Sequence, residues 1–245
     1  MFDDKRPLAA LTRKLGSLAP LDDLDRQALH SLPVTIESVK SGRYLVREGG
    51  EPTDCCLLLS GYACRNKVTV PGARQIVSFH IAGDILDLQH LHFAVADHHV
   101  QAITRAQVAW IPKAKLRALA RQRPAVAEAL WRDTLIDASI FREWVLNVGR
   151  RDAITRVSHM LCEFATRCEA AGLGPADRFE WPLTQEHIAD ATGLTPVHIN
   201  RTLKELSLKG CISSHRGRYR IEDWAMLKNI GEFDRAYLHA AAAAA

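Results

Sequence analysis

Residues 184–210 read TQEHIADATGLTPVHINRTLKELSLKG, and this stretch predicts two short helices joined by a tight turn. Thr184 is a good N-cap for the first helix, since its hydroxyl can accept a hydrogen bond from the first turn. Gly193 suits the end of that helix, because glycine adopts the left-handed conformation at little cost. Thr195 and Pro196 then start the second helix with a capping hydroxyl and a residue that needs no amide donor. The pattern is that of a helix-turn-helix.

The second helix of this pair has one apolar and one polar face. Ile199, Leu203 and Leu206 recur at helical spacing and form the buried stripe. The opposite face, near the N-terminus, is the part of a recognition helix that meets base edges in the major groove. The candidate base contacts on this face are Pro196, Val197, Asn200 and Arg201. The candidate phosphate contacts around it are Thr184, Thr195, His198 and Lys204. An ordinary helical hairpin with a solvated polar face is the alternative.

Two neighbouring features favour DNA as the partner of this segment. Residues 201–220 contain six cations against the single anion Glu205, a balance that suits a phosphate backbone. Residues 211–221, CISSHRGRYRI, predict a β-hairpin with a glycine turn, as in the wing of a winged helix. From this wing Arg216 and Arg218 are expected to contact phosphates.

Length and composition limit the class of protein. With 245 residues, 47% of them hydrophobic, the chain can hold two modest domains that each bury a core. The net charge of +4 is too small to indicate nucleic acid by itself. The N-terminal residues show no secretory signal and no run is long enough to span a bilayer, so we expect a cytoplasmic protein with no membrane partner. The alanine run that ends the chain is left out of the fold prediction.

The rest of the chain predicts an α+β architecture. Residues 21–32 have helical apolar spacing, whereas residues 34–111 form short strand-like runs broken by glycine and proline. Such runs predict a small β-roll, a jelly-roll type of barrel. After Pro112 the pattern becomes helical, with a short helix at 113–120 and a long one at 125–150.

The long helix carries a wide apolar stripe, and the segment 149–152 after it is predicted to be a hinge. A helix of this length is expected to pack one side on its own domain and the other on a second copy, as in a coiled coil. A single helix buried in a larger core is the alternative. The predicted dimer contacts are Leu130, Thr134, Ile140, Phe141, Trp144 and Val148. The expected domains are a roll at 1–123, the dimerisation helix and hinge at 124–150, the DNA-binding domain at 151–236 and a tail at 237–245.

A β-roll, a long helix and a winged helix, in this order, resemble the Crp/Fnr superfamily of bacterial transcription regulators. The resemblance covers residues 15–230 and is closest in wording to the alphaproteobacterial branch. It rests on Gly42, Gly61 and Gly83-Asp84, on WRDTLIDASIFREW, and on LTQEHIADATGLTPVHINRTLKEL. It implies a cyclic-nucleotide-binding-like roll and a non-enzymatic homodimer that binds a palindromic promoter site. It also implies signal input through the roll and the long helix, and a contact with RNA polymerase.

The resemblance also implies how bases are read, and this chain departs from the pattern. Family members use a Glu and an Arg one helical turn apart; Arg201 matches the Arg, but Val197 stands at the Glu position. Arg201 can bind guanine in a bidentate way, and Val197 can contact a thymine methyl group. Asn200 stands where many members have Ser or Gly, and it can pair with adenine. We therefore expect an altered half-site, repeated at a spacing of about 10–10.5 base pairs.

The residues that bind cyclic nucleotides in the family are missing here. The corresponding segment, residues 83–88, reads GDILDL, and Asp87 would place negative charge near the phosphate. No arginine occurs between Arg74 and Arg105 to bind that phosphate in a bidentate way. The sequence therefore argues against cyclic AMP as a ligand.

The cysteines argue against the iron–sulfur cluster of the oxygen-sensing branch. There is no cysteine before Cys55, and the adjacent Cys55 and Cys56 would point to opposite faces of a strand. Redox sensing by one thiol, such as Cys64 or Cys162, stays open beside the alternative of a buried structural cysteine.

A cluster of histidines gives the competing hypothesis, a cupin-like metal-dependent enzyme or a haem or metal sensor. His80, His90, His92, His98 and His99 lie within a short part of the roll, and neutral imidazole suits several metals. The spacing from Gly83 to His90-Leu91-His92 is one residue longer than the cupin pattern. We favour solvated or hydrogen-bonded histidines, and so predict no metal site.

Overall fold

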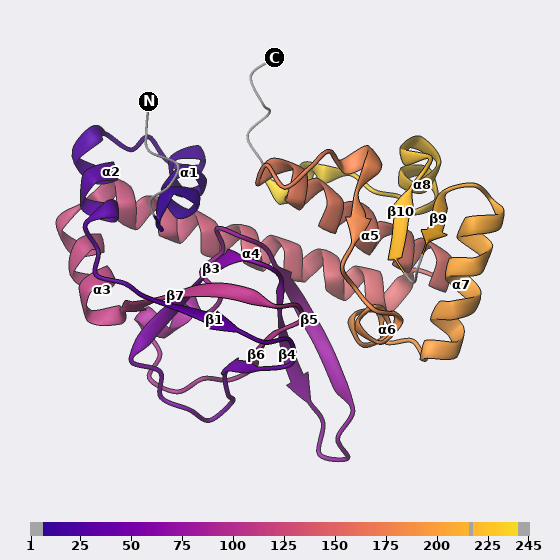
Figure 1. Cartoon of the computed structure of the whole chain (residues 1–245), viewed down its shortest axis with the longest axis horizontal. Coiled ribbons are helices and arrows are strands. Elements are labelled where there is room, and N and C mark those ends of the chain that lie inside the picture. The colour runs from indigo at the N-terminus through magenta and orange to yellow at the C-terminus, as the bar shows by residue number, and fades with distance from the viewer. Residues whose placement is uncertain (1–6, 216–217, 240–245) are drawn as a thin grey trace. The chain divides into compact units, whose positions relative to one another are not determined.

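A computed structural model describes residues 7–215 and 218–239 of the chain (Figure 1). It divides into two compact units, which are described separately. The first comprises the residues up to Asn66 together with Phe79–Ala138; the second comprises Lys67–Ser78 and the described residues from Ser139 onward. The boundary between these two units lies within the long helix, between Ala138 and Ser139. None of the helices in the described ranges has the length and apolar composition needed to cross a membrane.

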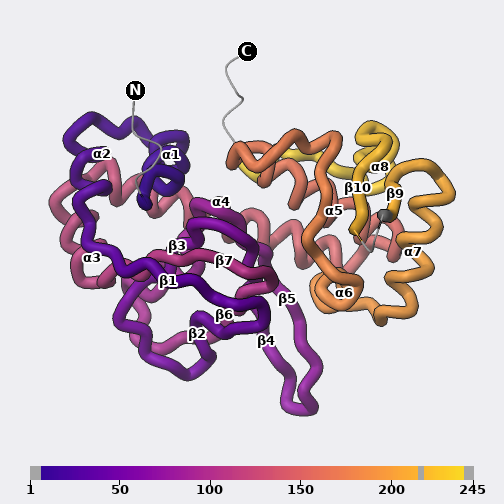
Figure 2. The backbone as a smooth tube through the Cα atoms, in the orientation of Figure 1, coloured from indigo at the N-terminus to yellow at the C-terminus, as the bar shows by residue number. Residues whose placement is uncertain are grey.

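The predicted β-roll is present and consists of two antiparallel sheets (Figure 2). Their strand orders are β1-β7-β3 and β2-β6-β4-β5. A core of small and branched apolar side chains lies inside the roll, among them Val39, Cys56, Leu86, Val100 and Val108. The strands are β1 (Thr35–Val39), β2 (Tyr44–Val46), β3 (Asp54–Ser60), β4 (Ala63–Val68), β5 (Arg74–His80), β6 (His99–Ala102) and β7 (Ala106–Pro112), with the 3-10 helix η1 (Leu88–Leu91) between β5 and β6.

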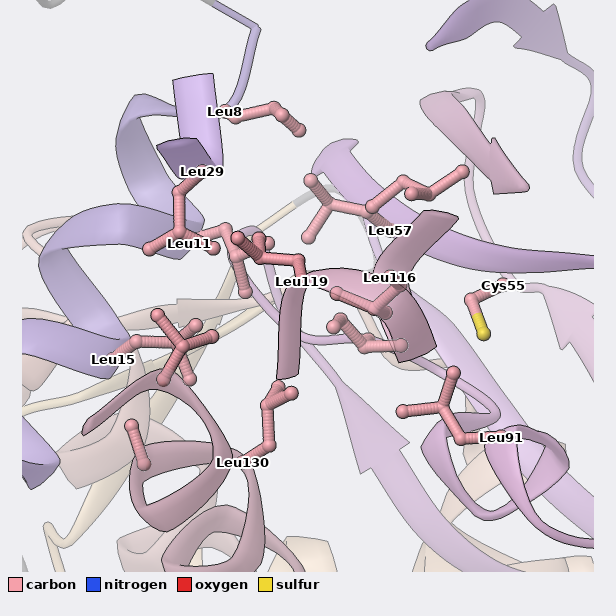
Figure 3. Packing of buried hydrophobic residues seen from close by; sticks show 14 of the residues in the cluster. Leu8, Leu11, Leu15, Leu29, Cys55, Leu57, Leu91, Leu116, Leu119 and Leu130 are labelled. Atoms are coloured by element: carbon pink, nitrogen blue, oxygen red, sulfur yellow. The ribbon is translucent and has the colours of Figure 1, made fainter. Parts of the chain in front are cut away.

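A second core joins the roll to the helices before and after it. These helices are α1 (Ala9–Leu18), α2 (Asp23–His30) and α3 (Lys113–Gln122). Figure 3 shows leucines of α1, α2 and α3 pointing toward one another and toward β3; the labelled residues include Leu11, Leu15, Leu29, Leu116 and Leu119. The sequence predicted α2 and α3, but it did not predict α1, whose fully buried Leu11 and Leu15 belong to this core.

The long helix α4 (Pro124–Arg150) presents two apolar stripes, not one. Leu130, Ile140 and Trp144 are buried within the chain itself. The assignment of these three residues to a dimer contact is therefore corrected, because they already have intramolecular neighbours. The large apolar side chains that α4 exposes are different ones, namely Trp131, Leu135, Val145 and Leu146. The predicted Thr134 is exposed, and Phe141 and Val148 are partly buried.

The helical conformation of α4 continues through Gly149, so the break follows at Arg151 and Asp152. Asp152 caps the next helix, since its carboxylate accepts a hydrogen bond from the Thr155 amide at 2.9 Å. The non-helical break between α4 and α5 is therefore two residues long, shorter than the segment 149–152 that was predicted to be a hinge.

The second unit is built as a winged helix. Its elements are α5 (Ala153–Ala170), η2 (Ala176–Arg178), β8 (Glu180–Trp181), α6 (Gln185–Thr192), α7 (Pro196–Leu208), β9 (Ile212–His215), β10 (Arg218–Ile221), α8 (Trp224–Ile230) and η3 (Arg235–Leu238). The strands form one small sheet in the order β8-β10-β9. Figure 1 shows this sheet beside α5, α7 and α8.

A buried polar network connects the end of α4 with α5 and η3. The Glu163 carboxylate accepts hydrogen bonds from the Trp144 indole at 3.0 Å and from the Tyr237 hydroxyl at 2.8 Å. Tyr237 also lies 3.1 Å from the His159 ring, whose other nitrogen is 2.9 Å from the Gly231 carbonyl. Burial raises the pKa of Glu163 and lowers that of His159. Tyr237 thus belongs to the folded unit and not to a tail, as the sequence had suggested for residues 237–245.

Candidate nucleic-acid interface

The first helix of the predicted helix-turn-helix is set by its two ends. The Thr184 hydroxyl accepts a hydrogen bond from the His187 amide at 3.2 Å, and the His187 ring accepts one from the Thr184 amide. This reciprocal pair is a capping box and fixes where α6 begins. Gly193 ends α6 in the left-handed conformation, with φ of +67°. A side chain at that conformation would be strained, so glycine determines the turn.

The second helix, α7, is oriented by its buried stripe. Thr195 caps it through a hydrogen bond from the His198 amide at 3.3 Å, and Pro196 occupies its first turn. Ile199, Leu203 and Leu206 are almost completely buried, as is Thr202. The opposite face of α7 is therefore forced outward.

That outward face carries the four candidate base contacts. Pro196, Val197, Asn200 and Arg201 are all exposed, Val197 to 71%. An exposed valine beside an arginine has no role in the core of this unit. Within the described residues, the Arg201 guanidinium has no hydrogen-bond or ion-pair partner and is available for an external one.

The candidate phosphate contacts are arranged around the same face. His198 and Lys204 are exposed on α7, while Thr184 and Thr195 lie at the two helix N-termini, where backbone amides favour anions. On the wing, Arg218 is exposed and forms an ion pair with Glu180 at 3.3 Å. Arg216 lies outside the described residues.

Two further side chains reach this face, and the sequence did not predict them. Gln185, the first residue of α6, donates a hydrogen bond to the Tyr219 hydroxyl at 2.9 Å. Its carbonyl oxygen accepts one from the Asn200 side chain at 3.4 Å. The sequence shows only where the two residues lie in the motif: Gln185 follows the N-cap of the first helix, and Tyr219 lies in the wing. Neither position reveals that the two side chains meet.

The geometry is that of a winged helix with an unpaired arginine, among the described residues, at its exposed recognition face. Family models match both halves of the chain. Residues 155–230 match the Crp-like helix-turn-helix domain. Residues 36–123 match the cyclic nucleotide-binding domain. The chain belongs to the Crp/Fnr family of transcription regulators. It is a DNA-binding regulator, as the helix-turn-helix predicted.

Relatives of known name agree with this assignment. The nitrogen fixation regulation protein FixK of Bradyrhizobium diazoefficiens is 29% identical, covering 78% of this chain and 79% of the relative. The fumarate and nitrate reduction regulatory protein of Vibrio cholerae is 27% identical, covering 81% of this chain and 77% of the relative. The solved structure of FixK2 from Bradyrhizobium japonicum shares the fold, with a TM-score of 0.74 and 24% identity, covering 81% of this chain and 98% of that one.

In this Crp/Fnr protein, the roll segment equivalent to the nucleotide-binding residues is tied to the protein itself. The buried Asp87 carboxylate accepts a hydrogen bond from the Cys56 amide at 2.8 Å. Asp84 accepts one from Lys14 at 2.7 Å, and a second from the Ile81 amide. Asp87, which was expected to repel a phosphate, and its neighbour Asp84 thus serve as internal hydrogen-bond acceptors.

One arginine does reach the interior of the roll, from β4. Arg65 is buried and donates to Asp137 of α4 at 2.7 Å and to the Leu86 carbonyl at 3.0 Å. Arg65 comes from a strand that precedes the arginine-free segment between Arg74 and Arg105. Its guanidinium is neutralised by Asp137, so the two side chains form an internal ion pair linking β4 to α4.

The histidines of the roll do not meet as a metal site. His90 is fully buried, whereas His92 is exposed, so the pair that resembled a cupin motif does not face one space. The rings of His90 and His98 stack at 6.1 Å, with Asp87 beside the first and Asp97 beside the second. The His99 ring accepts a hydrogen bond from the Glu48 amide. In the described ranges no three His, Cys, Asp or Glu residues are arranged to hold a metal ion, and the metalloenzyme alternative is not favoured.

Burial also affects the titration of these groups. Burial, together with the nearby Arg65 charge, lowers the pKa of His98 to about 4. The six cysteines are free and buried, and burial raises the pKa of Cys55 and Cys162. A raised pKa disfavours the reactive thiolate at neutral pH. For Cys162 this favours the structural interpretation over redox sensing.

Proposed function

We propose that this regulator acts as a homodimer that binds a palindromic operator through α7 and reads a half-site different from the one typical of its family. The observation that carries the proposal is the composition of the exposed α7 face. Arg201 supplies a bidentate contact to guanine, and Asn200 supplies one to adenine. Val197 replaces an acidic acceptor by a methyl-bearing side chain, which suits the thymine methyl group.

The experiment that tests this proposal is selection of bound sequences from random double-stranded DNA with the purified protein. We expect an inverted repeat with half-sites spaced by about one helical turn, roughly 10–10.5 base pairs. Each half-site should contain a guanine whose selection depends on Arg201. Enrichment of no sequence, or of a single unrepeated site, would contradict the proposal. A parallel selection with cell extract added shows whether a small molecule is needed.

The second copy is proposed to bind along the exposed stripe of α4. Trp131 and Val145 are exposed to 69% and 71%, so the single chain leaves large apolar side chains of α4 open to solvent. From the predicted set, Thr134 lies three residues after Trp131, Phe141 four residues before Val145, and Val148 three residues after Val145, which are spacings found in a coiled-coil seam. Two copies of this stripe would bury each other's apolar surface.

Val145→Glu tests the dimer directly. A charge within an apolar seam is left unpaired beside its symmetry mate, so we expect a shift from dimer to monomer in sedimentation equilibrium. Binding to a palindrome should weaken in parallel, by at least about tenfold. Leu24→Glu is the matched control, since Leu24 is also an exposed branched apolar residue, at 58%, but lies in α2. A Val145→Glu protein that stays dimeric would place the interface elsewhere.

The wing is proposed to contact phosphates, and Arg218→Ala tests it. Removing one phosphate contact should lower the slope of log K against log salt by about 0.9 for each protomer. The loss should be even across sequences, because phosphates carry no base information. Arg105→Ala, which removes an exposed cation of the roll, is expected to leave the slope unchanged. A change confined to particular bases would assign Arg218 to the bases instead.

Signal input through the roll and contact with RNA polymerase complete the proposal. Several relatives are named transcriptional activators, which supports a polymerase contact for this chain as well. The Arg65–Asp137 ion pair joins the roll to α4 within one unit, and so offers a route by which events in the roll reach the dimer helix.

A further inference from the structure

Three neutral side chains from three different elements meet at the recognition face. Asn200 lies on α7, Gln185 is the first residue of α6, and Tyr219 lies on β10. Strand β10 is the central strand of its sheet, paired with β8 on one side and β9 on the other. Tyr219 is therefore held by two ladders, with its neighbours Arg218 and Arg220 exposed on the opposite face of the strand.

The hydrogen bonds among the three have a defined direction. The Gln185 amide nitrogen donates to the Tyr219 hydroxyl at 2.9 Å, which leaves the Gln185 carbonyl oxygen to face Asn200. That oxygen accepts from the Asn200 amide nitrogen at 3.4 Å. The Tyr219 hydroxyl therefore holds the Gln185 amide in the orientation in which its oxygen faces Asn200.

This arrangement determines which groups Asn200 presents outward. An asparagine amide has two N–H donors and one carbonyl acceptor. One donor is used by Gln185, so the second donor and the carbonyl oxygen remain available side by side. Adenine presents one donor and one acceptor in the major groove, whereas guanine presents two acceptors. The free edge of Asn200 therefore matches adenine and mismatches guanine.

We propose that Gln185 and Tyr219 are positioning residues that make Asn200 select adenine over guanine. The proposal rests on the proposed DNA contact of α7 and deepens it. Without the Tyr219 hydroxyl, the Gln185 amide can turn and offer its nitrogen to Asn200. The Asn200 carbonyl oxygen then accepts this hydrogen bond, and the side chain presents only N–H donors outward. Two donors suit the two acceptors of guanine.

The experiment compares sequences selected from random DNA by the full-length wild type and by four variants. The relevant base pair is the one whose preference is lost in Asn200→Ala. Tyr219→Phe keeps the ring and removes the hydroxyl, and it should lower the adenine-to-guanine ratio at that pair by about two- to tenfold, the value of one neutral hydrogen bond. Gln185→Leu should lower the ratio to the same extent.

Gln185→Glu is the conservative variant that should preserve adenine selection. Its carboxylate only accepts hydrogen bonds, so the Asn200 nitrogen still turns toward it and the Tyr219 hydroxyl becomes the donor. The ratio should stay at the wild-type value, while affinity falls evenly for all sequences because of phosphate repulsion. A protein merely destabilised at this site would not show this split between ratio and affinity.

The other outcomes separate the inference from the function beneath it. If Tyr219→Phe and Gln185→Leu keep the wild-type ratio, or weaken binding evenly without changing it, the positioning role is wrong. If the wild type prefers guanine at that pair, the adenine assignment is wrong. If the wild type selects no repeated sequence at all, the proposed operator binding fails first, and the variants do not enter.

Discussion

Replacing Arg201 by alanine is expected to abolish sequence-specific DNA binding while leaving the dimer intact. A bidentate contact between arginine and guanine contributes about 1–3 kcal/mol of discrimination, and a dimer makes it in both half-sites. The expected loss is therefore about 2–6 kcal/mol, or about 30-fold to 10⁴-fold in affinity for the operator. Because the Arg201 side chain is exposed and unpaired among the described residues, its removal should not change the melting temperature.

Footprinting on a selected operator measures this effect, with nonspecific DNA as the reference. Nonspecific affinity should fall only slightly, because one cation per protomer is lost. Lys204→Ala is the matched control: it removes a neighbouring exposed cation of α7 and should weaken both kinds of DNA alike. Unchanged protection of the operator by the Arg201→Ala protein would mean that another element reads the bases.

The recognition face could be predicted from the sequence because local signals determine it. Thr184, Gly193, Thr195 and Pro196 are capping and turn residues whose effect depends on the backbone next to them. Once these fix the ends of α6 and α7, the burial of Ile199 and Leu203 determines which side chains point outward. Each of these signals acts between residues that are close together in the sequence.

Features that depend on distant residues could not be obtained in this way. The meeting of Gln185 with Tyr219 joins the start of α6 to a wing strand 34 residues later, and no spacing rule connects them. Helix α1 was not predicted because its leucine pattern is short. Its leucines are buried only through packing against distant parts of the chain. The position of Arg65 in the roll depends on the approach of β4 to residue 86, and no spacing in the sequence shows that approach.

Three of the predicted dimer contacts are buried within the chain for a different reason, because α4 has two apolar faces. Leu130 and Trp131 are adjacent, yet the first is 5% exposed and the second 69%. Apolar character alone cannot tell which face packs inward. The sequence therefore combined residues from both faces into one predicted interface.

Gly61 shows how a residue first noted through family resemblance acquires a physical reason. It lies between β3 and β4 with φ of +82°, and a Cβ there would stand 2.5 Å from the Arg105 carbonyl oxygen and 2.9 Å from the Ala106 Cα. Gly42 has nearly the same φ, +83°, but a Cβ there would meet nothing within 4 Å. The two glycines thus share the left-handed conformation and differ in the room beside them.

Gly61→Ala is therefore expected to destabilise the roll by at least about 4 kcal/mol, and Gly42→Ala by only about 1–2 kcal/mol. The smaller value is the cost of the left-handed conformation for an alanine, and the difference measures the backbone clash. Urea unfolding followed by circular dichroism gives both free energies of unfolding. Equal destabilisation by the two substitutions would show that the β3–β4 turn can move away from β7. The left-handed conformation of the turn alone would then explain the glycine at position 61, and the close packing of the two backbones would not be needed.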